Sequence, residues 1–141
     1  MNLSRRQTLA MGGAAATITL LPLSFAHATP EAAMEDIVEF SGGAEVGEGD
    51  ITLTAPEIAE NGNTVPISVA APGAVSILVL AEGNPQPNVA TFHFGAMAAS
   101  SAATRIRLAG TQNIIAVAKM ADGSFIKTAA SVKVTIGGCG G

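Results

Sequence analysis

The chain has 141 residues, of which 48% are hydrophobic and 13% are charged, so the composition predicts one folded domain and excludes an intrinsically disordered chain. Aromatic residues make up only 4%, with no Trp or Tyr, and the core must therefore come from small and β-branched residues that suit closely packed strands. The formal net charge of −4 is opposite in sign to that of a nucleic-acid-binding protein.

Residues 1–28 are predicted to be a removable export signal. Arg5 and Arg6 are followed by a charge-free stretch that ends in Ala26-His27-Ala28, an A-x-A cleavage signature. The stretch is rich in Ala, Gly and Thr and is interrupted by Pro22, which makes it a poor candidate for a membrane anchor. We therefore expect cleavage after Ala28 and no membrane anchor in the mature chain.

The two arginines also indicate the export route. The order Ser4-Arg5-Arg6-Gln7-Thr8-Leu9 resembles the twin-arginine motif, with Thr8 where a bulky apolar residue is usual. This resemblance implies that the protein crosses into the periplasm already folded, so that a partner without its own signal could travel in the same complex. Loss of both arginines with the signal changes the formal net charge from −4 to −6.

A short helix is predicted directly after the signal. The run Thr29-Pro30-Glu31 is a coherent start signal, because Thr caps the first turn and Pro suits the first helical position. The run Ser41-Gly42-Gly43 is predicted to end the helix. Between them, an apolar stripe repeats at helical spacing at Ala33, Ile37 and Phe40. The alternative is a partly ordered leader.

The remainder of the chain predicts β-strands, because short runs of β-formers are divided by Gly, Pro and Asn. The runs are Ile51–Ala55, Val65–Ala71, Val75–Ala81, Val89–Gly95, Thr104–Leu108, Ile114–Lys119 and Ser131–Ile136, with a weaker run at Ser124–Lys127. Seven or eight strands at this spacing indicate an all-β sandwich. Residues 29–136 are therefore predicted to be one sandwich domain with an N-terminal helix.

Local patterns predict how some of these segments are buried. In the run 104–108, arginines alternate with apolar residues, so one face should be exposed and the other buried. The run 75–80 is almost continuously apolar and should be covered on both faces. Asn61-Gly62 and Asp122-Gly123 are predicted to be turns with positive φ at glycine.

The sequence contains no recognisable catalytic or metal-binding constellation. Outside the signal it has a single histidine, His93, and a single cysteine, Cys139, which excludes an internal Cys/His zinc cluster or disulfide framework. His93 alternates with two phenylalanines and should lie on the surface or at a sheet edge rather than act as a base. Three acidic residues stand in predicted turns without acid/base spacing: Glu57, Glu60 and Glu82. We therefore expect no catalytic residue, no cofactor and no metal, and no enzyme activity of the chain alone.

The chain ends in Gly137-Gly138-Cys139-Gly140-Gly141, where four glycines surround the cysteine. Because glycine loses the most backbone entropy on ordering, residues 137–141 are predicted to be a mobile arm that spans roughly 17 Å when extended, at about 3.3–3.6 Å per residue. Such a thin arm can bring a thiol into a narrow site of another protein. An unperturbed cysteine has a pKa of about 8.5, so activation of the thiol must come mainly from that site.

These segments resemble the SoxY family, the sulfur-carrying subunits of the periplasmic SoxYZ complex of thiosulfate-oxidising bacteria. The resemblance rests on the terminal run 134–141, on Pro56–Pro66 and on Thr104–Ala109, together with the leader. It implies an immunoglobulin-like sandwich that forms a heterodimer with a SoxZ-like subunit. It also implies a swinging arm, formed by Gly137, Gly138, Gly140 and Gly141, that carries sulfur covalently on Cys139.

The resemblance further implies a cycle catalysed by other proteins. A SoxAX-like haem enzyme joins thiosulfate oxidatively to the cysteine sulfur, and a SoxB-like hydrolase removes sulfate. In many systems a SoxCD-like molybdenum and haem dehydrogenase then oxidises the retained sulfur, and the hydrolase releases a second sulfate.

Two functions of other classes remain open at this point. One is a carrier that uses the terminal Gly140-Gly141 as a thiocarboxylate, which the export signal opposes because such activation requires ATP, and which the strand pattern opposes because it does not resemble a β-grasp domain. The other is an adhesion or structural sandwich, for which the tail would have no role.

Overall fold

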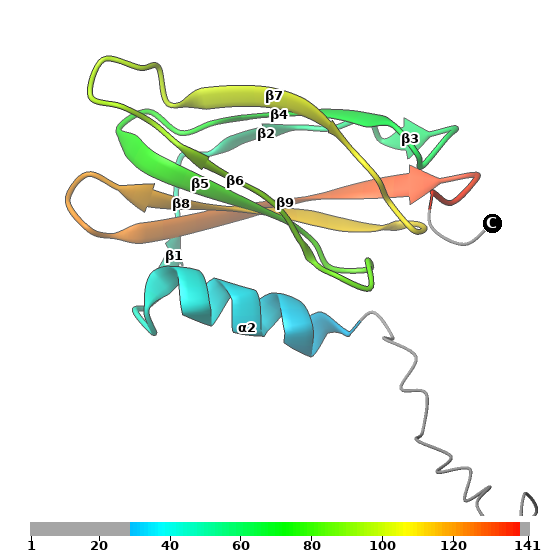
Figure 1. Ribbon diagram of the computed structural model, residues 1–141, viewed down its shortest axis with the longest axis horizontal. Helices are drawn as coiled ribbons and strands as arrows, with labels where there is room; N and C mark the ends of the chain where they lie inside the picture. The colour runs from blue at the N-terminus through cyan, green and yellow to red at the C-terminus, as the bar shows by residue number, and fades with distance from the viewer. Residues whose placement is uncertain (1–28, 139–141) are drawn as a thin grey trace, which may run out of the picture.

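The computed structural model describes residues 29–138, and within this range the chain forms a helix and a two-sheet β-sandwich (Figure 1). The predictions for the signal peptide, residues 1–28, and for Cys139, Gly140 and Gly141 fall outside the described residues. In chain order the elements are α2 (Pro30–Ser41), β1 (Val46–Glu48), β2 (Thr52–Thr54), β3 (Ile58–Ala59), β4 (Val65–Ala70), β5 (Ala74–Ala81), β6 (Asn88–His93), β7 (Ser101–Ile106), β8 (Gln112–Met120) and β9 (Phe125–Val134).

Helix α2 begins and ends where the sequence predicts. The side-chain oxygen of Thr29 accepts a hydrogen bond from the amide of Ala32 at 3.4 Å, and Pro30 occupies the first turn. Gly42 ends the helix in the left-handed conformation, with φ of 65°, which glycine adopts without a steric penalty. The predicted stripe is also confirmed, because Ala33 and Ile37 are buried.

The strands form two sheets. The larger has the order β1-β9-β8-β5-β6, with β3 also pairing with β9, and the smaller has the order β2-β4-β7. The core fills the space between them, and its fully buried side chains come from interior strands of both sheets: Val65, Val69, Ile77, Val79, Ile114 and Ala116. Each buried valine or isoleucine side chain among them contributes about 1.5–3 kcal/mol. The predicted all-β sandwich is confirmed.

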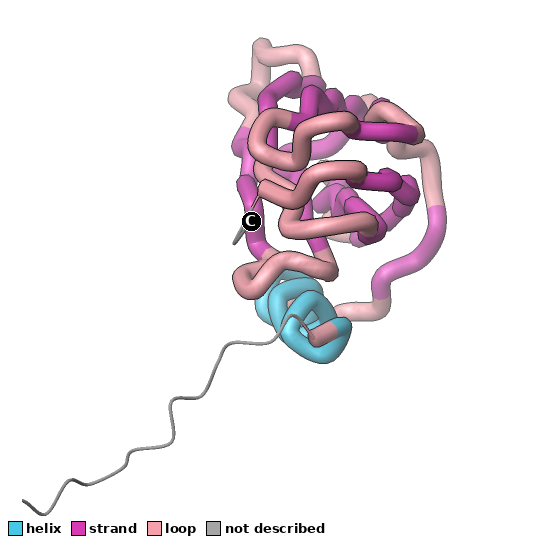
Figure 2. Tube along the Cα trace, turned by 90° about the vertical axis from the view of Figure 1, so that its right-hand side faces the viewer, coloured by secondary structure: helices cyan, strands magenta, loops and turns pink. Residues whose placement is uncertain are grey.

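The helix forms a third layer on the outer face of the larger sheet. Ile37 packs against Leu78, Leu80 and Val117, and Figure 2 shows α2 lying outside the strands rather than between them. Strand β5 is therefore covered on both faces, as its continuous apolar run predicts, since its alternate residues Ile77 and Val79 belong to the core between the sheets.

Two short strands were not predicted from the sequence. Val46–Glu48 pairs in parallel with the beginning of β9, and Ile58–Ala59 pairs in parallel with its end. Val46–Glu48 is interrupted by a glycine and Ile58–Ala59 has only two residues, so neither segment shows a run of β-formers in the sequence. The separately predicted runs 124–127 and 131–136 are one strand, because the small residues 128–130 continue the ladder with β8.

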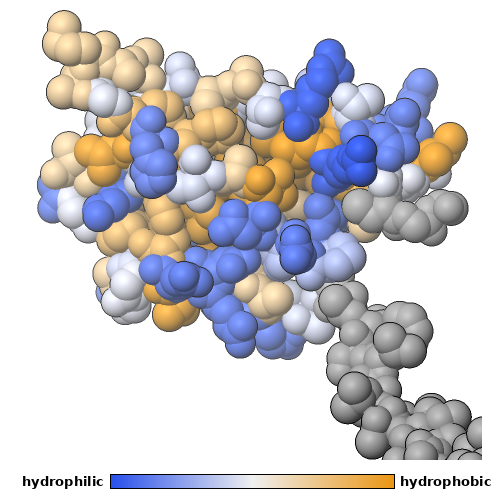
Figure 3. Space-filling model, in the orientation of Figure 1, coloured by the Kyte–Doolittle hydropathy of each residue, from blue (hydrophilic) through white to orange (hydrophobic). Residues whose placement is uncertain are grey.

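The polarity of the exposed surface differs between helix α2 and the loop that connects β6 to β7. Figure 3 shows mostly hydrophilic side chains over α2 and mildly apolar side chains over the loop between β6 and β7. On the helix, Glu31, Glu35 and Glu39 are exposed, and in the loop Met97 is 99% exposed. In β7 the predicted alternation is confirmed, with Arg105 exposed and Ile106 buried.

The turn between β8 and β9 has the predicted geometry. Gly123 has φ of 87°, and Asp122 accepts hydrogen bonds from the Ser124 hydroxyl at 2.6 Å and the Ser124 amide at 2.9 Å. These bonds, the hydroxyl first, lower the pKa of Asp122 from its ordinary value because they stabilise the carboxylate. At Asn61-Gly62 the predicted turn is present, and the Thr64 amide donates to the Asn61 carbonyl at 3.5 Å. The predicted positive φ is wrong there, because positive φ occurs among the described residues only at glycines 42, 43, 73 and 123.

Candidate functional site

The end of β9 leads into the predicted arm and is tied to β3 (Figure 1). The amide of Thr135 donates a hydrogen bond to the carbonyl of Ala59 at 3.0 Å. The Thr135 hydroxyl donates to the carbonyls of Ala59 at 3.1 Å and Glu60 at 3.2 Å. The short strand β3 therefore fixes the chain immediately before the glycine-rich tail.

The next residues are held by a chain of backbone hydrogen bonds that we call the clasp, formed by Gly62, Leu108, Ile136, Gly137 and Gly138. The amide of Gly62 donates to the carbonyl of Ile136 at 2.7 Å, and the amide of Leu108 donates to the carbonyl of Gly62 at 2.8 Å. The amide of Gly138 donates to the carbonyl of Leu108, also at 2.8 Å. Gly137 and Gly138, which the sequence assigns to a mobile arm, thus lie against the folded body.

The clasp leaves no room for side chains. A Cβ at Gly62 would lie closer than 3.0 Å to the Leu108 carbonyl oxygen and 2.9 Å from the Gly138 nitrogen. A Cβ at Gly137 would meet the Ala109 carbonyl oxygen closer than 3.0 Å, and one at Gly138 would lie 2.5 Å from the Gly62 carbonyl oxygen. Because these neighbours are backbone atoms, they cannot move out of the way by a side-chain rotation. Gly62 is therefore needed for close approach rather than for positive φ, which is the physical reason why the predicted φ at this turn is wrong.

A buried polar network supports the clasp. Asn84, in the loop between β5 and β6, is 8% exposed. Its amide nitrogen donates to the Arg107 carbonyl at 2.8 Å, and its oxygen accepts from the Ala109 amide at 2.9 Å and from the side-chain nitrogen of Gln112 at 3.0 Å. These bonds hold the backbone on both sides of Leu108, whose carbonyl accepts the hydrogen bond from the Gly138 amide. Nothing in the local sequence indicates these distant partners of Asn84.

Replacing Asn84 with alanine is expected to lower the free energy of unfolding by about 1–3 kcal/mol, because it leaves the Ala109 amide and part of Gln112 without a partner. Asn113→Ala is the matched control. The Asn113 side chain donates to Glu82 at 2.6 Å on the exposed surface, and its loss should cost no more than about 0.5 kcal/mol. Urea unfolding of both variants measures the difference, and equal losses would contradict a structural role for the network.

The surface around the clasp combines apolar and charged side chains. Ile136 is 67% exposed and Ile58 is 61% exposed. Four charged residues on the segments that lead into the clasp are also exposed, with both signs represented: Glu57, Glu60, Arg107 and Lys133. Within residues 29–138, no group of three or more His, Cys, Asp and Glu could hold a metal ion.

His93 lies apart from this surface. It is exposed and pairs with Ser76 at the end of β6, and β6 is an edge strand of the larger sheet. The prediction of a surface or edge histidine is therefore confirmed.

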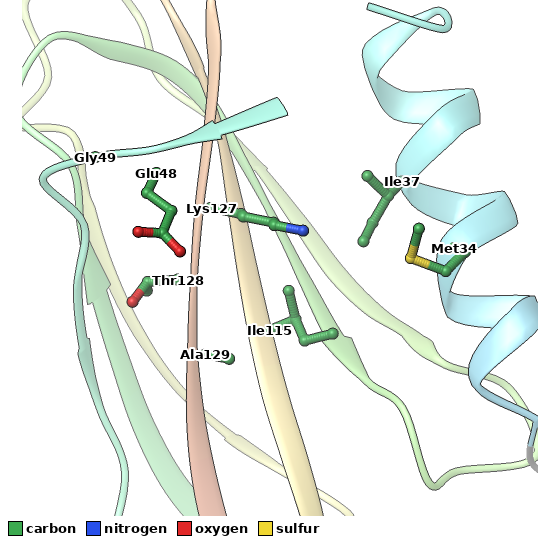
Figure 4. A pocket seen from close by; sticks show the side chains of 8 residues that line it. All are labelled: Met34, Ile37, Glu48, Gly49, Ile115, Lys127, Thr128 and Ala129. Carbon is green, nitrogen blue, oxygen red and sulfur yellow. The ribbon is translucent and has the colours of Figure 1, made fainter. Parts of the chain in front are cut away.

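A separate hollow of about 460 Å³ lies between α2 and the beginning of β9. Figure 4 shows the Lys127 amine pointing toward Ile37 of the helix, while the Glu48 carboxylate points away from it. Lys127 and Val134, at the other end of β9, are about 23 Å apart at a strand rise of about 3.3 Å per residue. The hollow is therefore remote from the clasp.

No helix in the described part of the chain is long and apolar enough to span a membrane.

Comparisons with known proteins agree with the resemblance seen in the sequence. The family model for the sulfur oxidation protein SoxY matches residues 37–139. The structure of the sulfur carrier protein SoxY from Chlorobium limicola f thiosulfatophilum is 33% identical, with a TM-score of 0.68, and the match covers 77% of this chain and 100% of that chain. A comparison with curated proteins found no match.

More distant structures share only the fold. Superoxide reductase (neelaredoxin) from Ignicoccus hospitalis is 15% identical, with a TM-score of 0.54, and the match covers 77% of this chain and 95% of that chain. A putative superoxide reductase from Thermotoga maritima is 17% identical, with a TM-score of 0.53 and coverage of 63% and 93%, respectively.

Proposed function

The chain belongs to the SoxY family of sulfur oxidation proteins, whose Chlorobium limicola member is a sulfur carrier, and we propose that it carries oxidation intermediates as covalent adducts of Cys139. The main observation in support is that the family match extends to Cys139, the residue that follows the clasp directly. The described part of the chain ends at Gly138, beside the surface formed by the 61–63 turn and Ala109. The thiol then belongs to the next residue along the chain.

The chemistry requires one sulfur that forms a reversible S–S bond. In loading, the Cys139 thiol and the outer sulfur of thiosulfate form a disulfide-type bond, releasing one proton and giving two electrons to a SoxAX-like haem enzyme. Hydrolysis by a SoxB-like enzyme then releases sulfate and two protons and leaves a persulfide anion on Cys139. The carrier supplies the attachment point, and the partners supply the catalysis.

The second half of the cycle belongs to systems with a SoxCD-like dehydrogenase. That enzyme would oxidise the outer sulfur of the persulfide to a sulfonate with three waters, removing six electrons and six protons. A second hydrolysis would release sulfate and two protons and restore the Cys139 thiolate. Covalent attachment throughout keeps reactive intermediates from diffusing away.

The proposed setting is the periplasm, reached by the twin-arginine route through Arg5 and Arg6, with a SoxZ-like subunit as partner in a heterodimer. The order of basic residues, charge-free stretch and A-x-A sequence in residues 1–28 supports export. The exposed surface around the clasp, with two isoleucines and charges of both signs, offers partner enzymes a contact area next to the segment that leads to Cys139.

Intact-mass spectrometry of periplasmic protein tests these proposals together. After incubation with thiosulfate and the SoxAX-like haem enzyme, without the SoxB-like hydrolase, the mature chain should begin at Thr29 and gain an S2O3 group in place of the thiol hydrogen. The gain should map to the C-terminal peptide and disappear with reductant. A chain that stays unmodified beside an active haem enzyme would contradict the carrier role, and a retained leader would contradict export with cleavage after Ala28.

A further inference from the structure

We infer that Gly62 is the positioning residue of the carrier arm: its turn seats Gly137 and Gly138 and thereby fixes the point on the body from which the chain continues to Cys139. This inference rests on the proposed attachment of sulfur to Cys139. It assigns a role to the Asn61-Gly62 turn, which lies 77 positions before Cys139 in the sequence.

Three segments distant in the sequence meet at this seat. The Gly62 amide donates a hydrogen bond to the Ile136 carbonyl, and the Gly62 carbonyl accepts one from the Leu108 amide. The Leu108 carbonyl in turn accepts a hydrogen bond from the Gly138 amide. All three hydrogen bonds are 2.7–2.8 Å long, within the range of well-formed backbone bonds. Gly62 therefore contacts the tail both directly and through Leu108, and it connects the tail to two loops of the sandwich.

The packing explains glycine at positions 62, 137 and 138 by space rather than by flexibility. At each position, a Cβ would come within 2.9 Å or less of a backbone atom in another segment of the clasp or in Ala109. Gly110, only one residue beyond Ala109, has nothing within 4 Å of its ideal Cβ position. Among the described glycines, a Cβ would come within 3.0 Å of backbone atoms only at these three positions, whereas at Gly49 and Gly83 the close neighbours are side-chain atoms.

This seat limits how far the sulfur can travel. With Gly138 held, the Cα of Cys139 lies about 3.8 Å from the Cα of Gly138, the span of one trans peptide, whereas release back to Ile136 would allow about 10 Å over three residues. A partner enzyme must then bring its reacting centre close to the surface formed by the 61–63 turn, Ala109 and Ile136. Recognition of the carrier and delivery of its cargo would therefore occur at one place.

Hydrogen exchange in the unaltered mature chain provides the first test. The Gly138 amide should exchange at least about tenfold more slowly than an unstructured amide of the same sequence, because it is bonded to Leu108. Exchange of Gly138 at the unstructured rate would overturn the inference. This measurement requires no variant and no thiol chemistry, so its outcome is independent of the proposed function.

A substitution series provides the second test, in complexes reconstituted with the partner enzymes. Gly62→Ala should remove the protection of the Gly138 amide and reduce the rate of thiosulfate loading on Cys139 about tenfold or more, since misplacement of a reacting group by about 1 Å can cost 10²-fold. Reaction of Cys139 with a small thiol reagent should not slow. This contrast separates misplacement of the arm from damage to the thiol.

Two glycines serve as matched controls. Gly110→Ala adds a methyl group beside the clasp in open space and should leave loading unchanged. Gly49→Ala places a Cβ 2.8 Å from the Ile126 side chain, near the other end of β9, and should lower stability without affecting loading at temperatures where the chain is folded. Equal slowing in Gly49→Ala and Gly62→Ala, or normal loading by a folded Gly62→Ala, would overturn the inference. If Gly62→Ala does not fold, Gly138 exchange in the unaltered chain decides the question.

The failure of this inference can be distinguished from failure of the proposed function. If Cys139→Ser still supports thiosulfate oxidation, the carrier role fails, while Gly138 exchange is unaffected. If Cys139 is loaded normally but Gly62→Ala has no effect, the carrier role stands and the seat is not a positioning device.

Discussion

Cys139→Ser is expected to abolish thiosulfate oxidation by the reconstituted system and to leave the sandwich folded. A serine hydroxyl cannot form the S–S bond that loading requires, and no other cysteine exists in the chain to replace it. Because the proposed mechanism turns over only through this adduct, the residual rate should equal that of the partner enzymes without carrier. Sulfate release measures the activity, and thermal unfolding verifies that the variant is folded.

Extending the chain by one residue beyond Gly141 is the matched control for this substitution. The extension leaves the thiol in place and should retain activity, whereas a carrier that used a terminal thiocarboxylate would fail completely. Any activity of Cys139→Ser above the carrier-free rate would contradict the thiol mechanism. A structural sandwich, the third alternative, would retain its function after both changes.

Elements whose signals are local were predictable from the sequence. Thr29 and Pro30 at one end of α2, and Gly42 at the other, define the helix through contacts within a few residues. Strand β5 was predictable because its apolar run is long and uninterrupted, and the burial of Leu78 and Leu80 against the helix follows from it. The identity of Cys139 as the candidate thiol required only that it is the single cysteine.

Features that depend on distant partners were not predictable. Strand β3 exists because β9 offers it a partner more than seventy residues later, and Asn84 is buried because Arg107, Ala109 and Gln112 satisfy its side chain. None of these pairings leaves a periodic or compositional signal.

The glycine-rich tail is a second case in which the local sequence was not enough to predict the structure. Glycine is compatible both with mobility and with close packing, and composition alone favoured mobility for all of residues 137–141. For Gly137 and Gly138 the structure shows close packing, because Ala109, Leu108 and Gly62 occupy the space that side chains would need. A glycine-rich sequence therefore does not distinguish a flexible linker from a tightly packed one until its neighbours are known.

Leu108→Ala is expected to lower the free energy of unfolding by about 2–5 kcal/mol, since the side chain is fully buried in the core and its removal leaves a cavity. The backbone carbonyl of residue 108 would still accept a hydrogen bond from the Gly138 amide, and its amide would still donate to the Gly62 carbonyl. The variant should therefore lose stability while the folded fraction keeps its loading rate, in contrast to Gly62→Ala. Urea unfolding, with loading measured at a temperature where the chain remains folded, separates the two quantities.

Ile136→Ala provides the comparison for this core substitution at the same end of the molecule. Its side chain is 67% exposed, so truncation should change the free energy of unfolding by no more than about 0.5 kcal/mol. Unchanged denaturant m-values in both variants would show that the differences lie in the native state. If Leu108→Ala costs no more than Ile136→Ala, the core does not extend beneath the clasp, and the tail would be held by its backbone bonds alone.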